Sequence, residues 1–422
     1  MLIDFFRNSL CLEKLMFFVE MWRQFFRACV NRCSKNLAPQ IPKKAILINK
    51  WNFEKSLIQV LSCALILMTA FRLEACTGMK LKAQDGSTVN GRTLEFGTPV
   101  DISIALIPRG YAFTGTTPDG PGLSYRSKYG AVGAISFGQL ALMDGVNEKG
   151  LSAGTFYFPG YASYSTITKE NQAQALSPVE FVHWILTQFA TIDEIREALN
   201  EVVIAPTVAK EWGEAPAPFH YVVYEPSGKS LVIEPLDGKL VTYDNPLGAF
   251  TNSPTFDWHM TNLRNYINLR VDNVAERTIG GVALTPFGQG SGLVGLPGDF
   301  TPPSRFIRAA LFSAAVNPVA GGEESVFQLF HLLNQFDIPR GVARQKVGQT
   351  TYSDYTMVTS VKDPKALKYY FKTYEDQTIH FVDLKKFDMD ATGVKLLSPK
   401  TAQRAVELNG VVRKKEHMKD VE

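Results

Sequence analysis

The order of strand and helix signals predicts an α+β protein of stacked antiparallel sheets covered by helices. Strand signals dominate residues 76–160 and 219–243, helical signals separate and follow them, and a last strand pair spans Tyr355 to Asp383. Strands such as residues 221–225, YVVYE, show little alternation between polar and apolar side chains. Such strands are typical of a sheet that packs against a second sheet on one face and helices on the other.

The first predicted element is a β-hairpin at residues 76–96, CTGMKLKAQDGSTVNGRTLEF. Its residues alternate around Asp85-Gly86, a strong signal for a two-residue turn. A turn of that length places Cys76 opposite Glu95 on the neighbouring strand.

Helical signals follow in two groups. The motifs Ser177–Glu180 and Thr191–Glu194 are capping boxes that each open a helix, the first with proline at its first helical position. Between the two groups, turns at Pro226–Gly228 and Asp237-Gly238 divide residues 219–243 into strands. The predicted helices are residues 180–190, 192–202, 304–315 and 323–336.

The chain has 422 residues with 44 basic and 41 acidic side chains, enough to bury a large core. This near balance of charge argues against an extended phosphate-binding surface, so nucleic acid is not an expected partner. No linker, repeat or low-complexity tract interrupts residues 76–400. We therefore expect one domain over residues 76–422, with a charged tail at residues 411–422 that is frayed or lies at a subunit contact.

Residues 50–75 have the features of a signal peptide. An uncharged, mostly apolar segment at residues 56–71 follows two lysines and precedes a small residue, Ala75, as a cleavage site. The segment is shorter than the roughly 20 residues of a membrane-spanning helix. Residues 1–49 form an N-terminal extension, either an interfacial amphipathic helix or, as we favour, an over-extended start of the reading frame. We expect export, with a mature protein that is periplasmic or secreted and is not bound to a membrane.

Cleavage after Ala75 makes Cys76 the first residue of the mature chain. The cysteines of the chain all lie within its first 76 residues, at positions Cys11, Cys29, Cys33, Cys63 and Cys76. The mature chain therefore keeps a single thiol and can form no internal disulfide. The same cut leaves 33 basic and 36 acidic residues, a net charge of −3, so the basic excess of the full chain indicates no partner.

Cys76 has three interpretations on its position alone. As an N-terminal nucleophile, its thiol attacks an acyl carbon while its own α-amine, with a pKa of about 7.7 to 8.0, moves the proton. As a lipoprotein anchor, it is acylated within Leu73-Glu74-Ala75-Cys76, although Glu74 fits a lipobox badly. As a structural residue, it is simply buried, like most lone cysteines.

Two charged residues of the hairpin bear on this choice. Arg92 is close enough to lower the pKa of the Cys76 thiol, and Glu95 can hold the amine. Ordinary surface charge on a solvated strand explains both residues as well. A bulge at Asn90-Gly91 would move one side chain to the other face of the hairpin.

Other motifs in the chain indicate no further site. Residues 150–154 match G-x-S-x-G but lead from a turn into a strand, so they form a hairpin exit rather than a nucleophile elbow. Residues 290–295 match G-x-G-x-x-G, yet prolines follow where a dinucleotide site needs a helix. The histidines show no pair at metal-ligand spacing, and we predict neither a metal nor a cofactor.

Several ordered segments carry a resemblance to a known family. They are the start Cys76-Thr77-Gly78, the pair Gly91-Arg92, and residues 144–162, 251–269, 295–312 and 355–374. In these segments the chain resembles the choloylglycine hydrolases, that is, bile salt hydrolases and penicillin V acylases, which are N-terminal nucleophile hydrolases. The resemblance implies the four-layer αββα sandwich of that family, a small-molecule N-acyl amide substrate, and a homo-oligomer, specifically a tetramer.

The resemblance also implies a catalytic set. Cys76 matches the nucleophile, Arg92 the arginine that contacts its sulfur, and Arg305 the second active-site arginine. The backbone N–H of Tyr157 and the side-chain amide of Asn252 match the two halves of the oxyanion hole. Two such donors lower the energy of the tetrahedral intermediate by several kcal/mol in comparable sites.

Without the resemblance, two of these residues are explained by structural roles that involve no catalysis. Asn252 is a turn residue ahead of Pro254, and Arg305 is a surface residue near the start of a helix. Glu95 departs from the family, which usually has Asp at this position. The carboxylate of Glu95 therefore lies one methylene further from the backbone. This carboxylate is the group that should contact the Cys76 amine.

These residues predict hydrolysis of a linear, non-peptide C–N amide bond through a thioester on Cys76. An apolar acyl pocket is predicted from four aromatic residues, of which two are core residues in the plainer interpretation: Phe156, Phe158, Phe256 and Trp258. Tyr157 resembles the acylase-type residue at its position, which together with export favours penicillin V or N-acyl homoserine lactones as substrates. The alternatives are a conjugated bile salt hydrolase and, in another class, a lipidated surface lipoprotein that serves as a binding module.

Mass spectrometry of the exported protein is expected to find an unmodified chain that begins at Cys76. N-acylation of Cys76 removes the α-amine base and thioether formation removes the nucleophile, so the hydrolase and the lipoprotein make opposite predictions. A lipid on Cys76 would contradict the hydrolase, and a bare N-terminal Cys76 would contradict the lipoprotein.

Overall fold

The computed structural model describes residues 75–97, 100–213, 215–347, 349–399 and 402–407. The predicted signal peptide, the N-terminal extension and the charged tail at 411–422 lie outside the described residues, so these assignments stay predictions. Within the described part of the chain, no helix is both long enough and apolar enough to cross a membrane.

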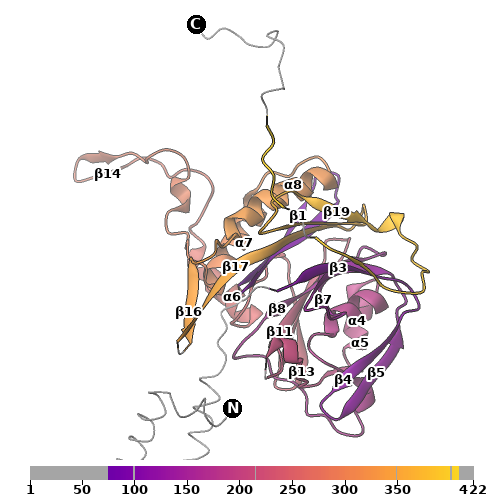
Figure 1. Cartoon of the computed structure of the whole chain (residues 1–422). Helices are drawn as coiled ribbons and strands as arrows, with labels where there is room; N and C mark the ends of the chain where they lie inside the picture. Colours follow the sequence, from indigo (N-terminus) through magenta and orange to yellow (C-terminus); the bar gives the residue numbers. More distant parts are fainter. Residues whose placement is uncertain (1–74, 98–99, 214, 348, 400–401, 408–422) are drawn as a thin grey trace, which may run out of the picture. The chain divides into compact units, whose positions relative to one another are not determined.

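Two large antiparallel sheets form the centre of the fold (Figure 1). Within the described residues, the first sheet has six strands in the order β1-β2-β17-β18-β19, with β16 paired to β17. Its strands are β1 (Cys76–Lys82), β2 (Thr88–Phe96), β16 (Ala343–Val347), β17 (Thr350–Asp363), β18 (Lys368–Thr373) and β19 (His380–Asp383).

The second sheet has eight strands within the described residues, in the order β13-β12-β11-β8-β7-β6-β3-β20. Its strands are β3 (Ile102–Ile107), β6 (Ala131–Ser136), β7 (Leu142–Asn147), β8 (Ser152–Tyr157), β11 (Phe219–Tyr224), β12 (Ser230–Leu236), β13 (Lys239–Asp244) and β20 (Lys395–Leu397). Residues 150–154 lead from a turn into β8, which confirms the predicted hairpin exit.

Helices cover the outer face of each sheet (Figure 1). The helices α7 (Pro302–Ala315) and α8 (Gly322–Leu333) pack on the first sheet, and α4 (Phe181–Gln188) and α5 (Ile192–Ala198) bury their apolar faces against the second. A further helix, α6 (Phe256–Leu263), contacts α7. The predicted four-layer αββα sandwich is confirmed.

Shorter elements lie outside the two large sheets. Three two-stranded pairs are formed by β4 (Ala112–Thr117) with β5 (Gly120–Arg126), β9 (Ala175–Leu176) with β10 (Val203–Ile204), and β14 (Arg277–Ile279) with β15 (Val282–Leu284). The described 3-10 helices are η2 (Gln172–Gln174), η3 (Lys210–Trp212), η4 (Arg264–Tyr266), η5 (Ser291–Leu293), η6 (Asn334–Phe336) and η7 (Leu384–Lys386).

The strand β11 shows why its sequence lacks alternation. All six of its residues are buried. Tyr221 packs outward against Phe181 of α4, with ring centroids 4.5 Å apart, while Val222 faces the first sheet. A strand between two apolar layers needs large apolar side chains on both faces.

A buried ion pair links the two sheets. The carboxylate of Asp144 on β7 accepts hydrogen bonds from the Lys362 ammonium on β17 and from the Tyr369 hydroxyl on β18, the latter at 2.7 Å. Asp144 and Lys362 are both buried, so removing either partner would leave an uncompensated charge between the sheets.

The predicted register of the first hairpin is wrong by one residue. Cys76 pairs with Leu94 rather than with Glu95. The turn holds three residues instead of two, because the Ala83 N–H donates to the Ser87 carbonyl at 2.8 Å and Gly86 adopts a left-handed conformation with φ of 82°. The change of one residue moves Glu95 to the face of the hairpin opposite Cys76.

The irregularity considered at Asn90-Gly91 does not occur between β1 and β2, which pair continuously from Thr88 to Leu94. A register shift appears instead in β17, between Thr356 and Val358, where that strand pairs with β2.

Of the two predicted capping boxes, the second caps its helix as predicted and the first does not. Thr191 is the N-cap of α5, where its side chain accepts the Glu194 N–H at 3.2 Å, as predicted. In the first motif the Glu180 carboxylate accepts the Ser177 N–H at 2.7 Å, but α4 begins only after Glu180. A turn therefore precedes α4 where the sequence predicts its first helical residues.

Replacing Gly133 with alanine should destabilise the protein by about 1 to 3 kcal/mol or more. A Cβ atom at Gly133 would lie 1.9 Å from the Asp144 carbonyl oxygen, a backbone atom that cannot move without distorting β7. Chemical denaturation should show a lower midpoint for Gly133→Ala. Gly393→Ala is the matched control, since a Cβ atom there meets nothing within 4 Å, and equal midpoints for the two variants would contradict the close approach.

Candidate active site

The structure brings several of the predicted catalytic residues together from distant parts of the chain. Cys76 begins β1, Tyr157 ends β8, and Arg305 lies in the first turns of α7. Asn252 lies in the loop between β13 and α6. All four residues are buried.

The side-chain amide of Asn252 joins the other three. Its Oδ1 accepts hydrogen bonds from the Cys76 N–H and from Nη2 of Arg305, each at 2.7 Å. Its Nδ2 donates to the Tyr157 carbonyl oxygen at 2.9 Å. Asn252 is therefore fixed between the start of β1 and the end of β8, and it is more than a turn residue ahead of Pro254.

Arg305 is buried, contrary to the surface position that its sequence context also allowed. Its guanidinium donates to the Cys76 carbonyl, to Oγ1 of Thr77 at 2.9 Å, and to the Phe300 carbonyl at 2.8 Å. Burial lowers the pKa of Arg305 to about 10, while Glu95 and Cys76 act in the opposite direction because negative charge on either stabilises the cation. Arg305 thus supplies positive charge beside the thiol.

Arg92 points into the space between the two sheets. It pairs with Gly78, so it lies on the same face of the hairpin as Cys76. Its guanidinium donates to the Thr155 carbonyl and stacks over the Phe156 ring, with 4.0 Å between Cζ and the ring centroid. Among the described residues, no carboxylate forms an ion pair with Arg92.

Glu95 lies on the other face of β2 and accepts a hydrogen bond from Oγ1 of Thr356 at 2.7 Å. Burial raises the pKa of Glu95 to about 7, and the positive charge of Arg305 opposes that rise. The N–H of Cys76, which here follows Ala75, donates to Asn252 rather than to Glu95. The contact between Glu95 and a free Cys76 amine stays a prediction.

The edge of β1 is bonded to the loop that carries Asn252. Gly78 and Phe250 exchange two backbone hydrogen bonds, at 2.7 and 3.0 Å. The strand that begins with Cys76 and the loop of Asn252 are therefore held in one fixed arrangement.

A model of the linear amide C–N hydrolases, choloylglycine hydrolase family, matches residues 76–397. The chain belongs to this family. It is therefore an enzyme that hydrolyses C–N bonds in linear, non-peptide amides.

Individual relatives agree with this assignment. The chain is 35% identical over 322 residues to a bile salt hydrolase/transferase of Clostridium perfringens, covering 76% of this chain and 95% of that one. It is 26% identical to the penicillin V acylase of Pectobacterium atrosepticum, covering 72% of this chain and 79% of that one. The crystal structure of a mutant conjugated bile acid hydrolase from Clostridium perfringens superposes with a TM-score of 0.70 at 33% identity, covering 79% of this chain and all of that one.

The predicted acyl-pocket aromatics of this choloylglycine hydrolase family member mostly lie in the core. Phe156, Phe158 and Phe256 are each at most 2% exposed, whereas Trp258 on α6 is 43% exposed. Three of the four side chains are core residues, where the plainer interpretation of the sequence expected two. Their role in binding an acyl group stays a prediction.

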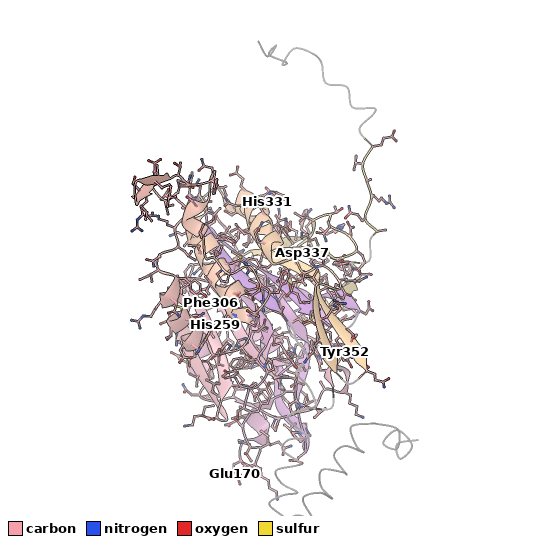
Figure 2. The ribbon with its side chains drawn as sticks, turned by 90° about the vertical axis from the view of Figure 1, so that its left-hand side faces the viewer. Glu170, His259, Phe306, His331, Asp337 and Tyr352 are labelled. Carbon is pink, nitrogen blue, oxygen red and sulfur yellow. The ribbon has the colours of Figure 1, made fainter. Side chains whose placement is uncertain are left out.

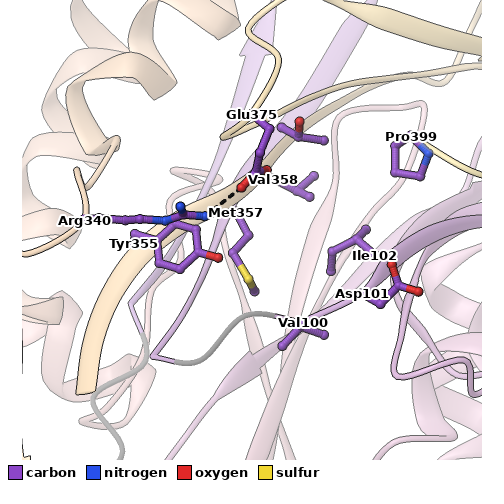
Figure 3. Close-up of a pocket in the computed structure, with 10 residues that line it drawn as sticks. Val100, Asp101, Ile102, Arg340, Tyr355, Met357, Val358, Glu375 and Pro399 are labelled. Carbon is purple, nitrogen blue, oxygen red and sulfur yellow. Dashed lines mark hydrogen bonds and ion pairs between the residues drawn. The ribbon is translucent and has the colours of Figure 1, made fainter. Parts of the chain in front are cut away.

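A cavity of about 430 Å³ lies near the site, where the two sheets meet (Figure 3). Val100 and Ile102 line it from one side, and Met357 and Val358 of β17 line it from the other. Val358 pairs with Leu94, which in turn pairs with Cys76, so the cavity wall lies two strand spacings, about 10 Å, from β1. The sequence carries no signal for this cavity, because its walls come from distant segments.

A histidine that the sequence analysis left without a role also contacts the site. His259 on α6 approaches the Asn252 carbonyl with its Nε2, at 2.9 Å, and stacks on Phe306 (Figure 2). No group of histidine, cysteine and acidic residues in the described part of the chain is arranged to hold a metal ion.

Glu95→Gln should change the pH dependence of stability. The folded state holds the Glu95 proton up to a pKa of about 7, above the ordinary value of 4.5, so the free energy of unfolding of the wild type falls as the pH rises through this window. Glutamine cannot ionise and escapes that loss. Relative to wild type, the variant should gain on the order of 3 kcal/mol between pH 4.5 and pH 8.

Guanidinium unfolding at these two pH values measures the gain. Glu201→Gln, at an exposed position, is the control and should show no comparable gain. A constant difference between Glu95→Gln and wild type at both pH values would mean that Glu95 ionises as easily in the folded protein as in the unfolded chain.

Proposed function

We propose that this enzyme is an N-terminal cysteine acylase in which Cys76 is the nucleophile and Asn252 and Tyr157 bind the oxyanion. The observation that carries the proposal is the position of the Asn252 amide, which is hydrogen-bonded to both Cys76 and Tyr157. A carbonyl carbon attacked by the Cys76 sulfur would place its oxygen close to Nδ2 of Asn252 and the backbone N–H of Tyr157, the two proposed donors.

The reaction needs a free α-amine on Cys76, which removal of residues 1–75 supplies. The amine accepts the thiol proton as the sulfur attacks the amide carbon, and it then passes that proton to the leaving amine as the C–N bond breaks. A water molecule next gives a proton to the α-amine and its oxygen to the thioester carbon. The C–S bond breaks, the carboxylic acid leaves, and the thiol regains its proton.

The buried arginines support a reactive thiolate. Arg305 contacts the Cys76 backbone, and Arg92 lies on the same face of the hairpin as the Cys76 side chain. Positive charge near a thiol lowers its pKa and increases the fraction of thiolate.

We propose an apolar or aromatic acyl group on the substrate, as in penicillin V or an N-acyl homoserine lactone. Val100, Ile102, Met357 and Val358 give the cavity an apolar wall that suits such a group, although Asp101 and the ion-paired Arg340 and Glu375 line it as well. Conjugated bile salts are the second candidate, and the 35% identity to a bile salt hydrolase/transferase over 95% of its length favours them.

We also propose that the mature enzyme is exported and forms a homo-oligomer, a tetramer. The β14–β15 hairpin projects away from the sheets (Figure 1). It exposes apolar side chains, among them Ile279, Val282 and Leu284, each at least 50% exposed. An apolar surface of this kind is typical of a subunit contact.

Cys76→Ala should abolish amide hydrolysis without loss of folding, and Asn252→Ala should lower kcat by about 10²- to 10³-fold. The assay uses penicillin V, glycocholate and a long-chain N-acyl homoserine lactone in parallel, with Glu201→Gln as a control of unchanged activity. Full activity of Cys76→Ala would contradict the nucleophile assignment. Preference for glycocholate over both other substrates would contradict the acylase assignment in favour of the bile salt hydrolase.

A further inference from the structure

A buried histidine–glutamate pair lies behind the Asn252 loop. His220 on β11 and Glu234 on β12 face the first sheet from neighbouring strands, and the register Tyr221 to Ile233 sets them opposite each other. Nδ1 of His220 lies 3.1 Å from Oε1 of Glu234. Their side chains are 1% and 0% exposed, and neither takes part in the acyl-transfer steps proposed for Cys76.

The second ring nitrogen of His220 contacts the backbone next to Asn252. Its Nε2 lies 3.0 Å from the Thr251 carbonyl oxygen. A carbonyl oxygen can only accept, so Nε2 carries the hydrogen. The imidazole stacks on Phe158 at 4.1 Å and contacts Phe250 at 4.3 Å, which fixes the orientation of the ring.

Glu234 contacts the same loop on the other side of Asn252. Its Oε1 accepts the Phe256 N–H at 3.0 Å, at the first residue of α6. The histidine–glutamate pair therefore holds both residue 251 and residue 256. The Asn252 carbonyl itself is held by His259, so the backbone on each side of the amide is fixed by a side chain.

Burial and the hydrogen bonds together assign the protons of the pair, because the contacts alone also fit an imidazolium that donates from Nδ1 to a carboxylate. With its hydrogen on Nε2, a neutral His220 presents a lone pair at Nδ1, and the hydrogen between Nδ1 and Oε1 must then belong to Glu234. Burial raises the pKa of Glu234 to about 8 and lowers the pKa of His220 to about 3, which agrees with a neutral acid beside a neutral imidazole. The charged groups nearby are Arg92, which disfavours the imidazolium, and Asp257, which disfavours the carboxylate.

We propose that Glu234, as the neutral acid, and His220 are positioning residues of this active site: Glu234 orients the imidazole, and the imidazole holds the Thr251 carbonyl so that the Asn252 amide meets the oxyanion. The inference rests on the proposed oxyanion role of Asn252. It extends the site to a layer that touches neither the substrate nor Cys76.

His220→Phe tests the imidazole, because phenylalanine keeps the stacking on Phe158 but cannot donate to Thr251. A displaced Asn252 amide weakens a contact made in the transition state, so kcat should fall by about 10- to 100-fold with KM within about threefold of wild type. Alkylation of Cys76 by iodoacetamide should proceed at the wild-type rate, which a general loss of structure would not allow.

Glu234→Gln and Glu234→Met test the proton on the carboxyl group. In the wild type Oε1 makes both contacts, and the amide nitrogen of glutamine can replace only the donation to Nδ1. Glu234→Gln should therefore keep the imidazole oriented and lower kcat by no more than about tenfold, less than Glu234→Met. Methionine has similar volume but provides neither contact, and it should lower kcat like His220→Phe. These two variants decide the matter if His220→Phe does not fold.

The possible outcomes separate this inference from the proposed function. Wild-type kcat in His220→Phe or in Glu234→Met, with the expected loss of kcat in Asn252→Ala, would overturn the positioning role and leave the acylase intact. Equal loss in Glu234→Gln and Glu234→Met would overturn the neutral acid. A wild-type enzyme that hydrolyses none of the amides, or an Asn252→Ala variant with full kcat, would overturn the oxyanion assignment and this inference with it.

Discussion

The hydrogen bonds of the Asn252 side chain hold together parts of the molecule that the sequence keeps far apart. Cys76 is 176 positions from Asn252 along the chain, and Arg305 is 53 positions beyond it. A single amide provides an acceptor for both and a donor for the end of β8. The two sheets and α7 must therefore all be in place before Asn252 can make these contacts together.

The contacts of Asn252 require a charged side chain, that of Arg305, to be buried. Arg305 is 1% exposed, and a guanidinium in that position is tolerated only when its donors are used. Backbone carbonyls, the Thr77 hydroxyl and Oδ1 of Asn252 use them. The Asp144–Lys362 pair satisfies the same requirement between the sheets. Few other conformations of the chain would supply partners for these buried charged side chains. Their burial therefore favours a single rigid arrangement of the site.

The sequence predicts what local chemistry determines. The N-cap of α5 at Thr191 and the doubly buried strand β11 are both recognisable from short segments, and the structure confirms them. The register of the first hairpin was missed because Asp85 and Gly86 signal a turn without fixing its length. The extra residue is stabilised by a hydrogen bond from the Ser87 N–H to the Asp85 side chain, at 2.9 Å.

Contacts between distant segments were the hardest to predict. The cavity beside Val358 and the pairing of His220 with Glu234 depend on the order of strands in the sheets, which no local pattern contains. The burial of Phe156, Phe158 and Phe256 has the same origin. Asn252 and Arg305 were found only through the family resemblance, since each has an ordinary explanation in its own segment.

The backbone bridge between Gly78 and Phe250 also bears on solubility. β1 is an outer strand of its sheet, and an outer strand with open N–H and C=O groups is a template on which another polypeptide can add and start a fibril. The bridge occupies these groups of Gly78 within the same molecule. The strand that carries the proposed nucleophile is thereby protected from aggregation, even though it lies at the border of a sheet and begins next to a predicted cleavage site.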